Sequence, residues 1–294
     1  MSINKKTRQL LSLTALQIFA TLLVLTFLMP TLWMISSSFK SSTEIFVVPI
    51  KWIPDSLRWK NYVDAFTQPA LPMWDFIKNT VMVVTVSLLG TMVSSVMVAY
   101  SFARLQWPGR RLFFGIMIAT LMLPGIITLI PRFIMFKDFG WINLTIPIID
   151  VYFPWLPLVV PPWFAGTGLY VFLMYQFMRG IPDELDEAAK MDGANRLQIL
   201  TRILLPLCKP VLATIAVFGL IQYYNEFMEP LIYLSKLDSW VLALGIRAFN
   251  DTNVQNWELV FSASVVMLIP VLVLFIVAQR YFVQGIAMTG FGGR

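Results

Sequence analysis

Long apolar stretches separated by short polar segments run along the whole chain. A helix rises about 1.5 Å per residue, so about 20 apolar residues cross the roughly 30 Å hydrocarbon core of a bilayer. Five stretches of at least that length contain no charged residue: Gln9–Phe39, Asn79–Ala103, Leu112–Pro131, Val151–Met178 and Leu259–Gln279. A sixth, Pro210–Asn225, is long enough only if Ile203–Leu207 belongs to the same helix.

This pattern predicts an all-α, polytopic membrane protein. We expect six transmembrane helices, at about residues 10–36, 78–103, 112–134, 155–178, 203–225 and 259–281. The first run is much longer than the core of a signal peptide, which has about 7–15 apolar residues, so we expect it to be retained. Residues 10–283 then form one transmembrane domain between a short N-terminus, 1–9, and a short tail, 284–294.

Composition agrees with this interpretation. Of the 294 residues, 58% are hydrophobic and 13% charged, whereas a soluble domain carries about 25% charged residues. The single cysteine, Cys208, excludes a disulfide within the chain, and the absence of histidine removes the commonest general base and metal ligand. We therefore expect no catalytic residues and no metal site.

The positions of the basic residues predict the orientation. If both termini are cytoplasmic, the cytoplasmic segments hold 13 of the 22 basic residues and 5 of the 16 acidic ones. Such an excess of Lys and Arg is typical of the cytoplasmic side. The net charge of +6 is thus explained by topology, and no nucleic-acid partner is expected.

The cytoplasmic loop 181–202 carries the signals of a short helix and a tight turn. Pro182 suits the first position of a helix, and Asp183 and Glu184 suit its positive end. Gly193 is a good terminator. A helix of two to three turns is therefore expected in this loop.

A second helix should begin at Asn195, where Gln198 completes a capping pair. On the first helix, Ala188 and Ala189 would let another backbone approach, and the acidic residues could bond to a partner's Arg or Lys. From the helical pattern alone, the loop is either an amphipathic helix lying on the membrane or a docking element for another protein.

The loop also carries a recognisable motif. Glu187-Ala188-Ala189, a glycine four residues later (Gly193) and then Leu205-Pro206 resemble the EAA loop of ABC importer permeases. In that family the loop is a coupling helix that seats in a cleft of the ATP-binding subunit. The resemblance favours docking and implies these ATPase-coupling residues: Asp183, Glu184, Glu187, Ala188, Ala189, Asp192 and Gly193.

The resemblance covers nearly the whole chain and is strongest to carbohydrate-uptake permeases of the maltose type. Further matching segments are Ser38–Lys40, Tyr100–Arg104, Pro108–Arg110, Met122–Gly125, Leu129–Pro131, Asn225–Phe227 and Pro230-Leu231. Tyr224 departs from the family, which usually has tryptophan there, and this weakens any claim that Tyr224 contacts sugar. The glycine-rich tail resembles the segment that reaches the ATPase interface in maltose-type permeases.

The resemblance implies a permease subunit of a binding-protein-dependent importer in a bacterial inner membrane. Its partners would be a homologous second permease, two copies of an ATP-binding subunit and an external sugar-binding protein. ATP and Mg²⁺ would be used by the ATP-binding subunits, and this chain would bind no cofactor.

The residues independently indicate that energy comes from elsewhere. The chain has no GxxxxGK[ST] phosphate loop, and five of the six predicted spans lack the acidic or histidine side chains that bind coupling ions. Two alternatives stay open: an ABC permease for another solute, such as an amino acid or glycerol phosphate, and a stand-alone channel or ion-coupled carrier.

Two groups of residues are candidates for the substrate pathway. Thr91 and Ser94 belong to a hydroxyl-bearing face of the second span, which either packs against other helices or lines a pore. Tyr223, Tyr224, Asn225 and Glu226 combine aromatic rings with hydrogen-bonding groups, which suits sugars, although an interfacial aromatic belt has the same composition. No residue selects between neutral and acidic sugars.

Overall fold

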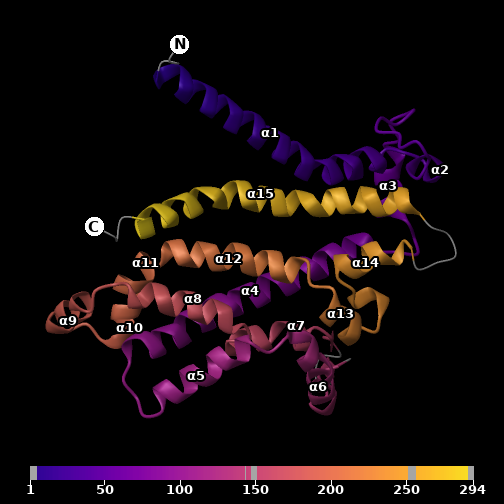
Figure 1. The fold of residues 1–294 in the computed structure, drawn as a ribbon. Helices are drawn as coiled ribbons and strands as arrows, with labels where there is room; N and C mark the ends of the chain where they lie inside the picture. Colours follow the sequence, from indigo (N-terminus) through magenta and orange to yellow (C-terminus); the bar gives the residue numbers. More distant parts are fainter. Residues whose placement is uncertain (1–4, 143, 147–150, 251–255, 291–294) are drawn as a thin grey trace. The chain divides into compact units, whose positions relative to one another are not determined.

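The computed structural model describes residues 5–142, 144–146, 151–250 and 256–290 (Figure 1). The predicted all-α fold is confirmed, apart from one antiparallel pair of two-residue strands, β1 and β2. The elements in chain order are α1 Lys5–Ser38, α2 Ser42–Ile45, α3 Lys60–Thr67, α4 Met73–Arg104, α5 Arg110–Leu121, α6 Gly125–Asp138, β1 Thr145–Ile146, β2 Val151–Tyr152, α7 Leu156–Val159, a 3₁₀ turn Pro161–Phe164, α8 Gly168–Arg179, α9 Glu184–Met191, α10 Arg196–Gln198, a π-helical turn Ile199–Leu204, α11 Leu205–Leu207, α12 Lys209–Tyr224, α13 Met228–Tyr233, a 3₁₀ turn Leu237–Ser239, α14 Leu242–Ala248 and α15 Trp257–Gly290.

Several of these helices are long and apolar enough to cross a membrane. Within the described residues, three segments meet this criterion as they stand: Leu13–Ser38, Met73–Arg104 and Leu156–Arg179. Two bent pairs of helices meet it jointly, and Trp257–Val273 is a shorter apolar helix. The protein therefore has several membrane-spanning helices, while the total of six stays a prediction.

Two predicted spans bend sharply at a break between two helices. In the third, 112–134, α5 and α6 meet at 106°. Pro124 has a ψ of 129° there, and proline has no N–H with which to continue the helix. In the fifth, 203–225, the helix breaks at Cys208 and the two parts meet at 77°. Pro210 lies in the first turn of α12, where proline is tolerated.

The chain divides into two compact units. One contains residues 1–71 and 246–268. In it, Asn61 Nδ2 donates to the carbonyl oxygens of Ser38 and Lys40 at 2.9 and 2.8 Å, and Ser262 Oγ donates to Ser38 O at 3.1 Å. These bonds attach α3 and α15 to the end of α1.

The second unit contains residues 72–245 and 269–294. Its central helix, α4, packs against α8, the 3₁₀ turn at Pro161–Phe164 and α12 (Figure 1). The packing is close: a methyl group added to Gly90 would lie 2.5 Å from Cδ1 of Trp163. Most of the hydroxyl-bearing residues of α4 are buried in this packing, namely Thr80, Ser87, Thr91, Ser94 and Ser95, whereas Ser101 is partly buried and Thr85 is exposed.

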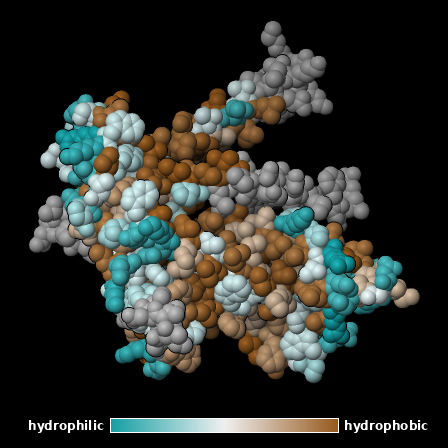
Figure 2. All heavy atoms as spheres, turned by 180° about the vertical axis from the view of Figure 1, so that it is seen from behind, coloured by the Kyte–Doolittle hydropathy of each residue, from teal (hydrophilic) through white to brown (hydrophobic). Residues whose placement is uncertain are grey.

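The outer surface of the second unit is strongly apolar. Figure 2 shows hydrophobic side chains gathered between groups of hydrophilic ones. Large exposed apolar residues include Leu112, Phe113, Ile116, Ile126, Ile127, Ile130 and Phe218. Exposed apolar surface on this scale marks contact with lipid or with other subunits.

Candidate functional sites: a coupling loop and a cavity

The loop between α8 and α12 folds as its sequence predicts. Gly193 has a φ of +80°, a conformation that glycine adopts without strain. Its N–H donates to Lys190 O at 3.0 Å, which closes the turn after α9. Asn195 and Gln198 form the expected capping box: each side-chain oxygen accepts from the other's backbone N–H, at 2.9 and 2.8 Å. Local signals therefore determine this loop.

Arg104, the last residue of α4, holds the loop in place. Its Nη2 donates to the carbonyl oxygens of Met178 and Ile181 at 2.9 and 2.7 Å. Its Nη1 forms an ion pair with Asp183, and its Nε lies 3.7 Å from Asp186 Oδ2. The Arg104 side chain is only 4% exposed and that of Asp186 10%. One buried guanidinium thus connects α4, the end of α8 and α9. We call this set of contacts the Arg104 clamp.

A second contact supports the clamp one turn earlier on α4. The hydroxyl of Tyr100 donates to Arg196 O at 3.2 Å. Ala189 and Ile199 are buried in the same hydrophobic cluster as Tyr100. The loop is therefore packed against α4 on both sides of its turn.

Six of the seven predicted coupling residues are exposed, and one of these six, Asp183, also belongs to the clamp. The exposed residues are Asp183, Glu184, Glu187, Ala188, Asp192 and Gly193, and Ala189 is buried. Three large apolar side chains beside them are also exposed, including Met191 at 89%, with Leu185 and Leu197. Exposed apolar side chains surrounded by charged ones mark interaction surfaces, so this loop is a candidate surface for a protein partner.

The same unit contains a cavity of about 740 Å³. Its wall comes from α4, the end of α5, α6, α7, the 3₁₀ turn Pro161–Phe164, the start of α8, the end of α12 and α13. Arg132 Nη1 and Glu229 Oε1 form an ion pair of 2.7 Å at the wall. Glu226 Oε1 accepts from the N–H groups of Met228 and Glu229 at 3.0 and 3.2 Å, so this side chain caps α13.

The predicted pathway residues divide into two groups. Tyr223 and Glu226 line the cavity, and the Tyr223 hydroxyl lies 2.6 Å from Thr91 Oγ1. Ser94 is buried and its Oγ donates to Pro162 O at 2.8 Å, so it packs helices together. Tyr224 and Asn225 are not among the described residues that line the cavity.

Sequence reasoning did not single out four charged residues of these sites: Arg104, Asp186, Arg132 and Glu229. Arg104 ends the family-matching segment Tyr100–Arg104 and counts among the basic residues of the cytoplasmic side, but no contact was predicted for it. Arg132 directly follows Pro131 in an apolar run, and a charge in such a position is a functional signal that could have been used.

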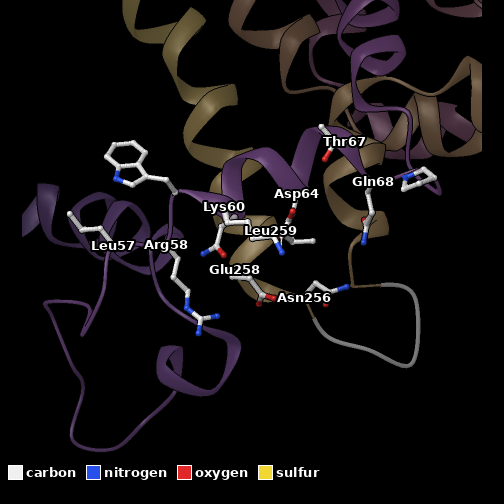
Figure 3. Close-up of a pocket in the computed structure, with 12 residues that line it drawn as sticks. Leu57, Arg58, Lys60, Asp64, Thr67, Gln68, Asn256, Glu258 and Leu259 are labelled. Carbon is white, nitrogen blue, oxygen red and sulfur yellow. Dashed lines mark ion pairs between the residues drawn. The ribbon is translucent and has the colours of Figure 1, made fainter.

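A second pocket, of about 820 Å³, lies in the other unit (Figure 3). Lys60 and Asp64 of α3 lie opposite Asn256 and Glu258 at the start of α15. Lys60 and Asp64 form an exposed pair at 3.9 Å. Exposed i,i+4 pairs are worth only about 0.3–0.5 kcal/mol. The pocket is polar with opposite charges on its wall, and no feature of it indicates a particular ligand.

In the part of the chain that the structure describes, no group of three or more Cys, Asp or Glu side chains is placed to hold a metal ion. The expectation that this chain binds no cofactor stays a prediction.

Comparison with known proteins identifies the family. Residues 90–288 match the family "Binding-protein-dependent transport system inner membrane component". The diacetylchitobiose uptake system permease protein NgcG of Streptomyces coelicolor is 33% identical over 86% of this chain and 80% of its own length. The arabinooligosaccharides transport system permease protein AraQ of Halalkalibacterium halodurans is 31% identical over 90% of this chain and 91% of its own.

A solved structure has the same fold. A chain of a bacterial ABC transporter that imports the acidic polysaccharide alginate superposes with a TM-score of 0.77, covering 96% of this chain and 99% of that one, at 22% identity. The sequence match and the fold agree with the predicted permease architecture. The chain therefore belongs to the family of inner membrane components of binding-protein-dependent transport systems, and has the multi-pass membrane fold of an ABC importer permease.

Proposed function

We propose that this chain is the permease subunit of an ATP-driven importer that carries a sugar or oligosaccharide across a bacterial inner membrane. It pairs with a homologous second permease and two copies of an ATP-binding subunit, and receives its substrate from an external binding protein. The named relatives for diacetylchitobiose and arabinooligosaccharides support a carbohydrate over an amino acid or glycerol phosphate.

The Arg104 clamp is the observation that carries the coupling mechanism. Because Arg104 bonds to α9 and to the end of α8 from the last residue of α4, a displacement of α9 is transmitted to a long membrane helix. ATP closes the two ATP-binding subunits, α9 moves with them, and α4 turns the cavity from one side of the membrane to the other. The outward-facing acids, Glu184 and Glu187, suit basic residues of the ATP-binding subunit.

The test is ATP-dependent uptake by the complete transporter in proteoliposomes, with the binding protein supplied. Glu187→Ala and Gly193→Leu should reduce uptake at least about tenfold, the effect of roughly 1.4 kcal/mol of lost coupling, while membrane insertion is unchanged. Asp138→Ala, which removes an exposed acid at the end of α6, is the matched control and should transport normally.

Two outcomes would contradict this function. Uptake by this chain alone without ATP would indicate a channel or an ion-coupled carrier. Full coupled uptake in the Gly193→Leu variant would show that the α9 loop does not transmit the movement.

A further inference from the structure

The wall of the 740 Å³ cavity carries an unequal number of charges. Among the described residues that line it, Arg132 is the one cation, and Glu226 and Glu229 are the two anions. With these side chains ionised, the wall has a net charge of −1. In surroundings of lower dielectric constant than water, charge interactions are strong. The sign of the net charge on this wall therefore affects which solutes enter the cavity.

The cation is already engaged. Arg132 Nη1 lies 2.7 Å from Glu229 Oε1, and both side chains are only partly exposed, at 34% and 25%. A substrate carboxylate that bound Arg132 would either lie beside the Glu229 carboxylate or displace it, and displacement would leave Glu229 partly buried without its cation. Removing one partner of such a pair is strongly unfavourable. Glu226 adds a second negative charge at the same wall. The arrangement opposes an anionic substrate.

The same pair suits uncharged hydroxyl groups. A hydroxyl both donates and accepts hydrogen bonds, so it can bridge a guanidinium and a carboxylate without separating them.

The rest of the wall has the composition of a sugar site. Tyr223 contributes an aromatic ring, and Pro157, Pro161, Leu121 and Leu129 contribute apolar surface. The volume lies within the range of about 300–1,000 Å³ that is usual for small-molecule sites, which combine apolar walls with a few polar groups. The face of a sugar ring can pack on the apolar part while its hydroxyls reach the polar part.

We infer that this cavity is a subsite for a neutral oligosaccharide and that it discriminates against oligosaccharides of uronic acids. The inference rests on the proposed function and specifies its substrate class. The superposed chain of an alginate transporter is only 22% identical to this chain, so that likeness shows the fold and not the substrate.

The test is protection of an introduced cysteine in the complete transporter, without the binding protein and both with and without nucleotide. Thr128→Cys places a thiol at the cavity wall, and Thr201→Cys places one on an exposed surface outside it. Each threonine hydroxyl bonds only within its own helix, to Gly125 O and Leu197 O, so the two variants are matched. The native Cys208 is fully buried. An uncharged maleimide is the labelling reagent.

Two probes differ only in charge: a neutral glucose trisaccharide and the same trisaccharide with its primary alcohols oxidised to carboxylates. The neutral probe should slow labelling of Thr128→Cys and leave Thr201→Cys unchanged. The oxidised probe should need an at least about tenfold higher concentration for equal protection. In a Glu226→Gln/Glu229→Gln background, which keeps an acceptor oxygen at each position, the oxidised probe should protect as well as the neutral one.

Equal protection by both probes in the unaltered wall would overturn the inference, and so would an absence of protection by either. ATP-dependent uptake of a sugar in the separate proteoliposome assay would still support the proposed function in both cases. Loss of that uptake would instead refute the proposed function.

Discussion

Substituting Arg104 tests the clamp directly. Arg104→Met removes the guanidinium and retains much of the apolar volume of the side chain. The two hydrogen bonds from Nη2 to the carbonyl oxygens of Met178 and Ile181 are lost. Asp186 is left buried without its cation. We expect the helical core of α4, α8 and α12 to persist, because its buried contacts lie elsewhere along α4, and the attachment of α9 to weaken.

The magnitude follows from what is left unpaired. A hydrogen bond from a charged group contributes about 1.5–3 kcal/mol, and removing one partner of a buried ion pair costs about 3–5 kcal/mol. The contribution of Asp183 is discounted because its side chain is 71% exposed. Nε of Arg104 has no hydrogen-bond partner and lies 3.7 Å from Asp186 Oδ2, so the pair is a weak one. For the free energy lost on breaking it we therefore take the lower limit of that range, about 3 kcal/mol. The detached state of α9 should then be populated at least about 100-fold more often.

Amide hydrogen exchange of residues 181–195 in the purified complex measures this population, because opening of α9 precedes exchange. Arg104→Lys is an informative comparison because it keeps the positive charge. Its single ammonium group cannot make the set of hydrogen bonds that the planar guanidinium makes with its five N–H donors. The double variant Arg104→Met/Asp186→Asn should recover part of the protection, because the buried charge is removed as well. Unchanged exchange in Arg104→Met together with coupled ATPase activity and uptake would refute the clamp.

Two further predictions concern packing and capping. Gly90→Ala should lower the free energy of unfolding by about 1–3 kcal/mol, because the new methyl group has to displace Trp163. Thermal unfolding in detergent measures this loss. Gly115→Ala, where nothing lies within 4 Å, should instead stabilise the protein by up to about 1 kcal/mol, because alanine is the better helix former. Asn195→Ala should cost about 1 kcal/mol through loss of the capping box and should accelerate proteolysis of the loop. Asn195→Asp should restore resistance, and equal proteolysis of all three proteins would contradict this role.

The sequence predicts the local structure well where the signal lies within a few residues. The turn at Gly193 and the capping box at Asn195 are examples, because a positive φ and a polar N-cap are determined by the residues themselves. The bend at Pro124 is a partial case. The proline indicates a break, yet the angle of 106° depends on what each half packs against.

The charged contacts could not be predicted in the same way. Arg104 and Asp183 are 79 residues apart in the sequence, and their pairing depends on how α8 returns beside the end of α4. Arg132 and Glu229 are further apart still. Hydropathy assigns each of these residues to a loop or to the end of a span, and only the tertiary fold determines its partner.

The contact of Trp163 with Gly90 has a consequence for how the subunit changes state. The Trp163 indole leaves no room for even one methyl group at Gly90. Rotation of α4 about its long axis would therefore require the indole to move out of this contact. Dense packing of this kind transmits strain, so we expect the packed helices around this contact to move as one block. We therefore expect the hinges of the subunit to lie at the helix breaks around Pro124 and Cys208, where the helical hydrogen bonding is already interrupted.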